Sequence, residues 1–82
     1  MTADDTVTEE LMALLREHRL VASHAEVPTT APIVQWLDSL GRLELVDALE
    51  ERWGVDLEDE LLGAAARELY LSDLVERIRA QV

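Results

Sequence analysis

The chain has 82 residues, enough for one small domain but too few for a large enclosed active site. Its 18 acidic and seven basic residues give a formal net charge of −11, which disfavours nucleic acid and anionic membranes and favours basic protein partners. Without cysteine, disulfides and thiolate metal sites are excluded. No signal-peptide pattern opens the chain and no apolar run reaches about 18 residues, so we expect a cytoplasmic protein with no membrane span.

The first predicted element is an amphipathic helix that begins near Val7 or Thr8 and ends at about Ser23. Thr6 and Glu9 have the spacing of a capping box, so residues 1–5 are expected to be flexible and residues 6–82 to form the domain. Apolar positions at helical spacing predict the face that packs inward, which consists of Val7, Leu11, Leu14, Leu15, His18 and Ala22.

A long loop is predicted between the first and second helices, over residues 24–37. Pro28 and Pro32 interrupt helical hydrogen bonding there. The loop is too apolar for a free linker, so several of its side chains are expected to lie against the helices, from the set Val27, Ile33, Val34, Trp36 and Leu37.

The second predicted helix runs from about Ser39 to Trp53. Asp38 or Ser39 can cap its first turn, and Gly54 suits a C-terminal stop. At about 100° per residue, one side is an apolar stripe formed by Leu45, Val46, Leu49 and Trp53. The other side carries an exposed leucine and a row of carboxylates, formed by Leu40, Glu44, Asp47 and Glu51 with Glu50 beside them.

Two further helices are predicted after an extended segment in which Val55 and Leu57 point inward. A short one covers Glu60 to about Leu69, with Leu61, Leu62, Ala65 and Leu69 on its apolar side. The last one is capped by Ser72 and buries Leu74, Val75, Ile78 and Val82. Trp53 and Tyr70 are expected in the core. The predicted fold is therefore all-α, a small up-down bundle of three main helices and one short helix with a long first loop.

The segment Asp38-Ser39-Leu40, continued by Leu43-Glu44-Leu45-Val46 and by Leu49-Glu50-Glu51-Arg52-Trp53-Gly54, resembles the acyl and peptidyl carrier proteins. The resemblance implies an acyl-carrier-like fold in which Ser39 carries a covalent 4′-phosphopantetheine arm taken from coenzyme A. Trp36 stands three residues before the serine, where carrier proteins usually have glycine.

The resemblance also implies a function without catalysis of its own. The arm's thiol would hold acyl, polyketide or aminoacyl intermediates as thioesters, in polyketide or nonribosomal peptide biosynthesis, with fatty acid synthesis as the alternative. The implied partners are a phosphopantetheinyl transferase and loading and condensing enzymes with basic surfaces, which a monomeric carrier would meet. The expected docking residues are Leu40, Leu43, Glu44, Asp47, Glu50 and Glu51.

Two other functions compete with this one. The chain could be an unmodified acidic helical interaction domain in which Ser39 is only a helix cap. It could also be a small hydrolase that pairs Ser39 with His18 or His24, although the sequence offers no oxyanion loop or placed base. For Leu40 and Leu43, partial burial against the first loop and contact with a partner are both expected. No metal site is predicted, because the acidic residues after Gly54 do not have EF-hand spacing.

Overall fold

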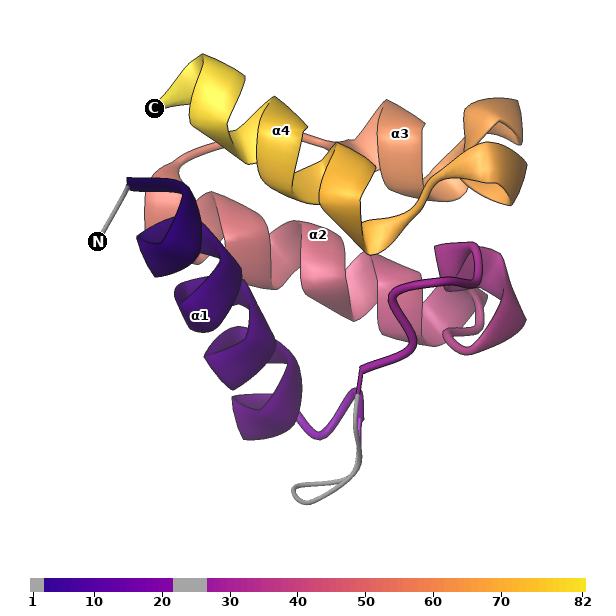
Figure 1. Cartoon of the computed structure of the whole chain (residues 1–82). Coiled ribbons are helices and arrows are strands. Elements are labelled where there is room, and N and C mark those ends of the chain that lie inside the picture. The colour runs from indigo at the N-terminus through magenta and orange to yellow at the C-terminus, as the bar shows by residue number, and fades with distance from the viewer. Residues whose placement is uncertain (1–2, 22–26) are drawn as a thin grey trace.

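The computed structural model describes residues 3–21 and 27–82, and every regular element in these residues is a helix (Figure 1). The predicted all-α class and the set of three longer helices with one short helix are confirmed. The α-helices are α1 (Ala3–Glu17), α2 (Ser39–Trp53), α3 (Glu58–Leu62) and α4 (Leu71–Gln81), and the 3₁₀-helices are η1 (Ile33–Gln35) and η2 (Ala64–Glu68).

None of the helices in these two ranges has the length and the apolarity needed to cross a membrane.

Helix α1 begins earlier than predicted. It starts at Ala3, inside the segment expected to be flexible, and Thr6 lies within the helix, so the predicted capping box is wrong. Met1 and Thr2 lie outside the described residues.

Helix α1 also ends earlier than the predicted Ser23, because the chain turns sharply after Glu17. Arg19 has a left-handed φ of 59°, and the N–H groups of Arg19 and Leu20 donate to the carbonyls of Arg16 and Leu15 at 3.0 and 2.8 Å. Such a turn satisfies the free carbonyls of a helix end. Leu20 packs against the core from outside the helix, and His18, which the predicted apolar face included, lies just beyond the helix end. Ala22, Ser23 and His24 lie outside the described residues.

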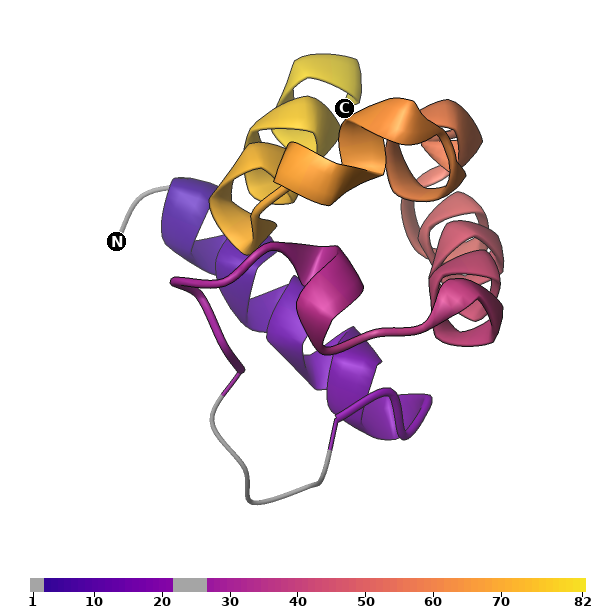
Figure 2. The same ribbon diagram turned by 90° about the vertical axis from the view of Figure 1, so that its right-hand side faces the viewer.

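The segment that leads into α2 is packed against the body of the protein, as predicted. Val27, Ile33 and Leu37 are buried, and Trp36 is half-buried against the same core. The N–H of Ile33 donates to the carbonyl of Leu69 at 2.8 Å. This bond joins η1 to the end of η2, and Figure 2 shows these two elements next to each other at one end of the molecule.

The short helix predicted from Glu60 to Leu69 is two separate elements. Helix α3 begins at Glu58, after Asp56 has accepted a hydrogen bond from the N–H of Glu58 at 3.1 Å, and it ends before Gly63. At Gly63 the backbone is extended, and a Cβ there would collide with the carbonyl oxygen of Asp59. The break changes the register, so the buried alanine is Ala66 and the predicted Ala65 is exposed.

Helix α4 begins one residue before the predicted Ser72 cap. The N-cap residue is Tyr70, whose N–H donates to Asp73 Oδ2 at 3.0 Å, and Ser72 is an exposed residue of the first turn. Tyr70 is itself exposed and is not a core residue, and Val82 projects beyond the apolar stripe with 63% of its surface exposed. Leu74, Val75 and Ile78 are buried as predicted.

One hydrophobic core receives side chains from all of these elements. Among its fully buried members are Leu11 and Leu15 of α1, Leu45 and Leu49 of α2, and Ile78 of α4. The predicted inward positions Val55 and Leu57 belong to it as well, and Trp53 packs partly against it. Helix α4 packs on α1, and helix α3 packs on α2. The buried residues of α2 all lie on the side that faces this core.

The role of Gly54 in ending α2 can be tested by substitution. It has a φ of 70°, and a Cβ added there would meet no atom within 4 Å, so replacement by alanine is opposed by backbone strain alone. We expect Gly54→Ala to lower the free energy of unfolding by about 1 kcal/mol in urea titrations followed by circular dichroism. Gly54→Asn is the control and should lose less, since asparagine tolerates this conformation. Equal stability of the alanine variant and the parent would contradict the assignment.

Candidate functional site

The candidate site is the solvent-facing side of α2, which we call the α2 surface. Every residue of α2 that falls within a contiguous arc of about 140° on a helical wheel is exposed. Leu40 and Leu43 have 75% and 44% of their surface exposed. The opposite arc carries the buried residues of α2. The α2 surface consists of Ser39, Leu40, Leu43, Glu44, Asp47, Glu50 and Glu51.

The structure therefore brings all of the sequence-predicted site residues together on one surface. Ser39 is at the N-terminal end, the two leucines follow within the first two turns, and the carboxylates continue to the fourth turn. The burial expected as one alternative for Leu40 is wrong, and Leu43 keeps contact with its surroundings only in part. Such exposed leucines beside carboxylates are suited to a partner that is apolar at its centre and basic at its rim.

The entrance to α2 is organised by Asp38. Its side chain accepts a hydrogen bond from the N–H of Gly41 at 2.8 Å, which makes Asp38 the helix cap and leaves Ser39 as the first helical residue. The hydroxyl of Ser39 is exposed and has no hydrogen-bond partner among the described residues. Ser39 is thus an accessible hydroxyl that the fold does not use as a cap.

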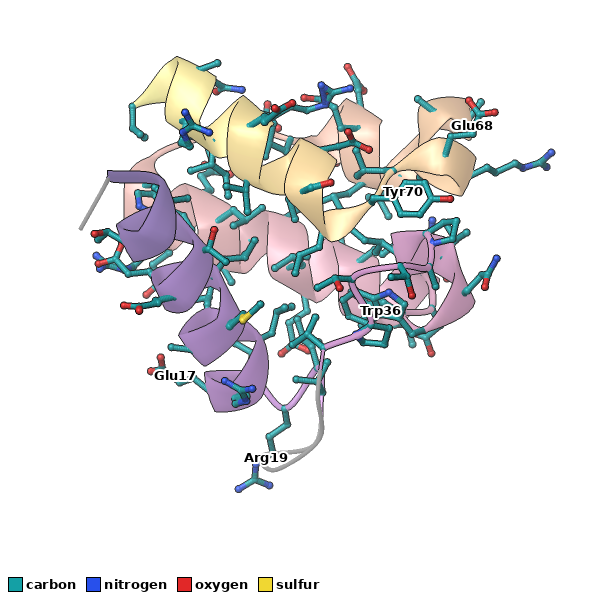
Figure 3. All side chains as sticks on the ribbon, in the orientation of Figure 1. Glu17, Arg19, Trp36, Glu68 and Tyr70 are labelled. Carbon is teal, nitrogen blue, oxygen red and sulfur yellow. The ribbon has the colours of Figure 1, made fainter. Side chains whose placement is uncertain are left out.

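Trp36 holds the segment before this entrance. Its φ of −127° lies in the ordinary region, so the backbone here does not require the conformational freedom of glycine. The ring is half-buried against the core, as expected of an anchor, and lies at the same end of the molecule as Tyr70 (Figure 3). Its Nε1–H is enclosed and has no hydrogen-bond partner among the described residues, a cost of about 1–3 kcal/mol that the packed ring must offset.

One residue beside the α2 surface was missed by the sequence analysis. Arg42 lies on the inward arc of α2, where Nη1 donates to the carbonyl of Leu61 at 3.2 Å and Nε to the carbonyl of Asp38 at 3.4 Å. Its guanidinium thus connects the first turn of α2 to α3. The sequence signal that could have identified Arg42 is a single basic residue between the apolar positions of α2, because a charge in such a position needs a hydrogen-bond partner.

The described histidine is far from Ser39. His18 lines a pocket of about 340 Å³ between α1 and the second half of α2, together with Leu14, Glu17, Ala48, Glu51 and Arg52. Ala48 lies nine residues after Ser39, which corresponds to roughly 14 Å along the helix axis. This is too far for His18 to accept a proton from the Ser39 hydroxyl directly.

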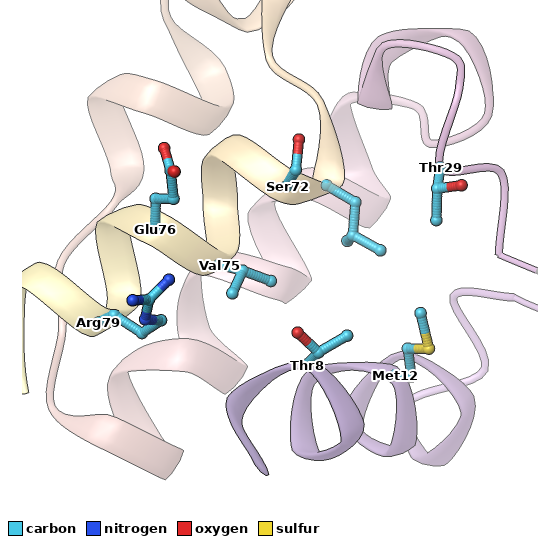
Figure 4. A pocket seen from close by; sticks show the side chains of 8 residues that line it. Thr8, Met12, Thr29, Ser72, Val75, Glu76 and Arg79 are labelled. Carbon is cyan, nitrogen blue, oxygen red and sulfur yellow. The ribbon is translucent and has the colours of Figure 1, made fainter. Parts of the chain in front are cut away.

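A second pocket lies between α1 and α4 and has a volume of about 290 Å³ (Figure 4). Thr8 and Met12 face Val75 across it, and α2 contributes no lining residue. In the described part of the chain, no group of three or more histidine, cysteine, aspartate or glutamate side chains is placed to hold a metal ion. This pocket is therefore separate from the α2 surface and its serine.

Comparison with protein-family models, with curated proteins and with solved structures gives no match for this chain. Interpretation of the site consequently depends on its residues and their arrangement.

The separate roles of Asp38 and Ser39 can be tested by stability measurements. Asp38→Ala removes the cap and should lower the free energy of unfolding by about 1 kcal/mol. Asp38→Asn should retain most of the stabilisation, because asparagine can also cap a helix. Ser39→Ala should stay within about 0.5 kcal/mol of the parent, because the exposed hydroxyl stabilises nothing in the fold. A larger loss in Ser39→Ala than in Asp38→Ala would show that the serine is the structural residue.

Proposed function

We propose that this chain is a carrier protein that bears 4′-phosphopantetheine on Ser39 and presents acyl, polyketide or aminoacyl groups to partner enzymes. The observation that carries the proposal is the combination of a free, exposed serine hydroxyl at the start of α2 with an uninterrupted surface of leucines and carboxylates behind it. The motif Asp38-Ser39-Leu40 and its continuation through α2 agree with the same function.

The residues around Ser39 fit such a group. The hydroxyl has no partner among the described residues that attachment would displace, and its position in the first turn places an attached phosphate near N–H groups that lack intrahelical partners. Gly41 is the exception, because Asp38 already uses its N–H. The guanidinium of Arg42, one turn along the helix, adds a positive group on this side.

The attachment chemistry requires little of this chain. Ser39 Oγ would form a bond to the phosphorus that bears pantetheine in coenzyme A, while the pyrophosphate bond breaks and adenosine bisphosphate leaves. The serine proton would pass to a base on the transferase, since the described residues place no histidine beside Ser39. When bound, the group supplies a thiol on a long flexible tether, and a cysteine-free chain has no thiol of its own.

The α2 surface would guide the encounter with each partner. Glu44, Asp47, Glu50 and Glu51 are exposed and attract basic enzyme surfaces, while Leu40 and Leu43 offer the apolar contact. Exposed charges mainly increase the association rate and are screened by salt, so such contacts form quickly and dissociate quickly. Serial visits to several enzymes require both properties.

Attachment can be tested by intact-mass spectrometry. After incubation with coenzyme A, magnesium and a broad-specificity phosphopantetheinyl transferase, the protein should gain the mass of one phosphopantetheine group. Ser39→Ala should gain nothing. The matched control is Ser72→Ala, because Ser72 is an exposed serine in the first turn of α4, and this variant should be modified like the parent.

Failure of the parent to gain mass, or modification that persists in Ser39→Ala, would refute the proposed function. The competing function, an unmodified interaction domain, gives a different result, because Ser39→Ala would then retain binding of the partner. The two functions are therefore distinguished by the serine and not by the acidic surface that they share.

The role of the carboxylates can be tested through the rate of the same modification reaction. Glu44→Gln combined with Asp47→Asn should slow it several-fold at low ionic strength, and the difference should shrink as salt is added. The control combines Glu68→Gln with Glu76→Gln, which removes two exposed charges that lie away from α2. The two double variants therefore have the same net charge as each other. Equal slowing in both double variants would attribute the effect to net charge alone.

A further inference from the structure

Arg42 is a charged group whose hydrogen bonds go only to neutral carbonyls. Its guanidinium is half-buried and bonds to the backbone oxygens of Leu61 and Asp38 at 3.2 and 3.4 Å. Although the chain has 18 acidic residues, no carboxylate of the described residues forms an ion pair with it. The positive charge beside Ser39 is therefore solvated by weak acceptors and not neutralised.

Arg42 is close enough to Ser39 to interact with a charged group attached to the serine. Residues three apart on a helix are neighbours, so the Cβ atoms of Ser39 and Arg42 are about 5–6 Å apart. The flexible arginine side chain can reach toward the serine or toward α3, where it now ends at the carbonyl of Leu61. A phosphodiester on Ser39 would be a stronger partner than a carbonyl, because it adds a full negative charge and can accept two parallel hydrogen bonds from the guanidinium.

We infer that Arg42 couples modification of Ser39 to the α3–η2 segment: an anion at position 39 withdraws the guanidinium from Leu61 and loosens the end of α3. The inference rests on the proposed function, since the anion it names is the phosphate of the attached arm. Arg42 acts here as a positioning residue that holds α3 in one state and the phosphate in the other.

The segment beyond Leu61 is suited to such a response. Helix α3 has five residues, which is too short for stability on its own, and it stops at the break before Gly63. Leu57 and Leu61 are fully buried and keep the start of α3 attached to the core. Beyond Leu61, the N–H groups of Gly63 and Ala66 donate to the carbonyls of Asp59 and Gly63 at 2.9 and 3.1 Å. Ala66 and Leu69 are buried, and Leu69 accepts a hydrogen bond from Ile33. The expected effect is therefore a transient local opening between Leu61 and these two buried residues, measured over residues 62–69, with the rest of the fold unchanged.

Hydrogen exchange measures this opening directly. In the phosphopantetheinylated protein, amides of residues 62–69 should exchange about threefold to tenfold faster than in the unmodified protein, as expected for the loss of one hydrogen bond, while amides of α4 serve as the internal reference. Arg42→Met keeps the length and apolar bulk of the side chain. It should exchange fast in this segment before modification and show no further change after it.

A second experiment removes the dependence on the transferase. Because the chain has no cysteine, Ser39→Cys introduces a single thiol that methanethiosulfonate reagents label through a mixed disulfide with release of methanesulfinate. A sulfonate-bearing label places an anion at position 39, and a trimethylammonium-bearing label of similar size places a cation there. Only the sulfonate should accelerate exchange in residues 62–69, and Arg42→Met should abolish the difference between the two labels.

These outcomes separate the inference from the proposed function. Equal exchange of residues 62–69 with the two labels would overturn the coupling, even if the transferase modifies Ser39. A response to the sulfonate in a protein that the transferase does not modify would support the coupling and refute the carrier function. A response that persists in Arg42→Met would assign the effect to another group and overturn the role of Arg42.

Discussion

Leu45 and Leu49 on α2 are fully buried in a core that α1, α3, α4 and the η1 segment complete, whereas the residues of the α2 surface, on the opposite side of the same helix, are exposed. Each buried leucine contributes about 2 kcal/mol, and the core holds many of them. The surface ion pair between Arg52 and Glu10 contributes at most about 1 kcal/mol by comparison. Because stability comes from the inward arc, the outward arc is free to carry Ser39 and the carboxylates without a structural role.

The parts of the fold that follow from local sequence rules could be predicted. The limits of α2 were predicted correctly because Asp38 and Gly54 directly flank the helix, and their effects and those of the apolar stripe act on near neighbours in the sequence. The inward positions of Val55, Leu57 and Ile33 followed from alternation and composition. The exposure of Ser39 agrees with its place on the polar side of the predicted helical wheel, opposite the apolar stripe of Leu45 and Leu49.

The incorrect predictions concern places where tertiary structure determines the result. The predicted apolar face of the first helix continued through His18 and Ala22, but the helix ends at Glu17 and the chain makes a left-handed turn at Arg19, which the pattern does not contain. Gly63 was treated as a weak helical residue, whereas its backbone is extended and leaves no room for a Cβ beside the Asp59 carbonyl, so the helix breaks there. Arg42 was missed because its partner Leu61 is 19 residues away, so no local rule links them.

The electrostatics of the α2 surface set opposing requirements at Ser39. In the proposed function, the carboxylates that would attract basic partners would also repel a phosphate on the same helix, and the formal net charge of −11 would add to this repulsion. The first-turn N–H groups and the Arg42 guanidinium are the groups on α2 that can offset it close to the serine. Arg42 lies on the inward arc, so the α2 surface itself carries no basic residue. In the proposed coupling, the bond to the carbonyl of Leu61 is what keeps the guanidinium on α3 until an anion is attached to Ser39.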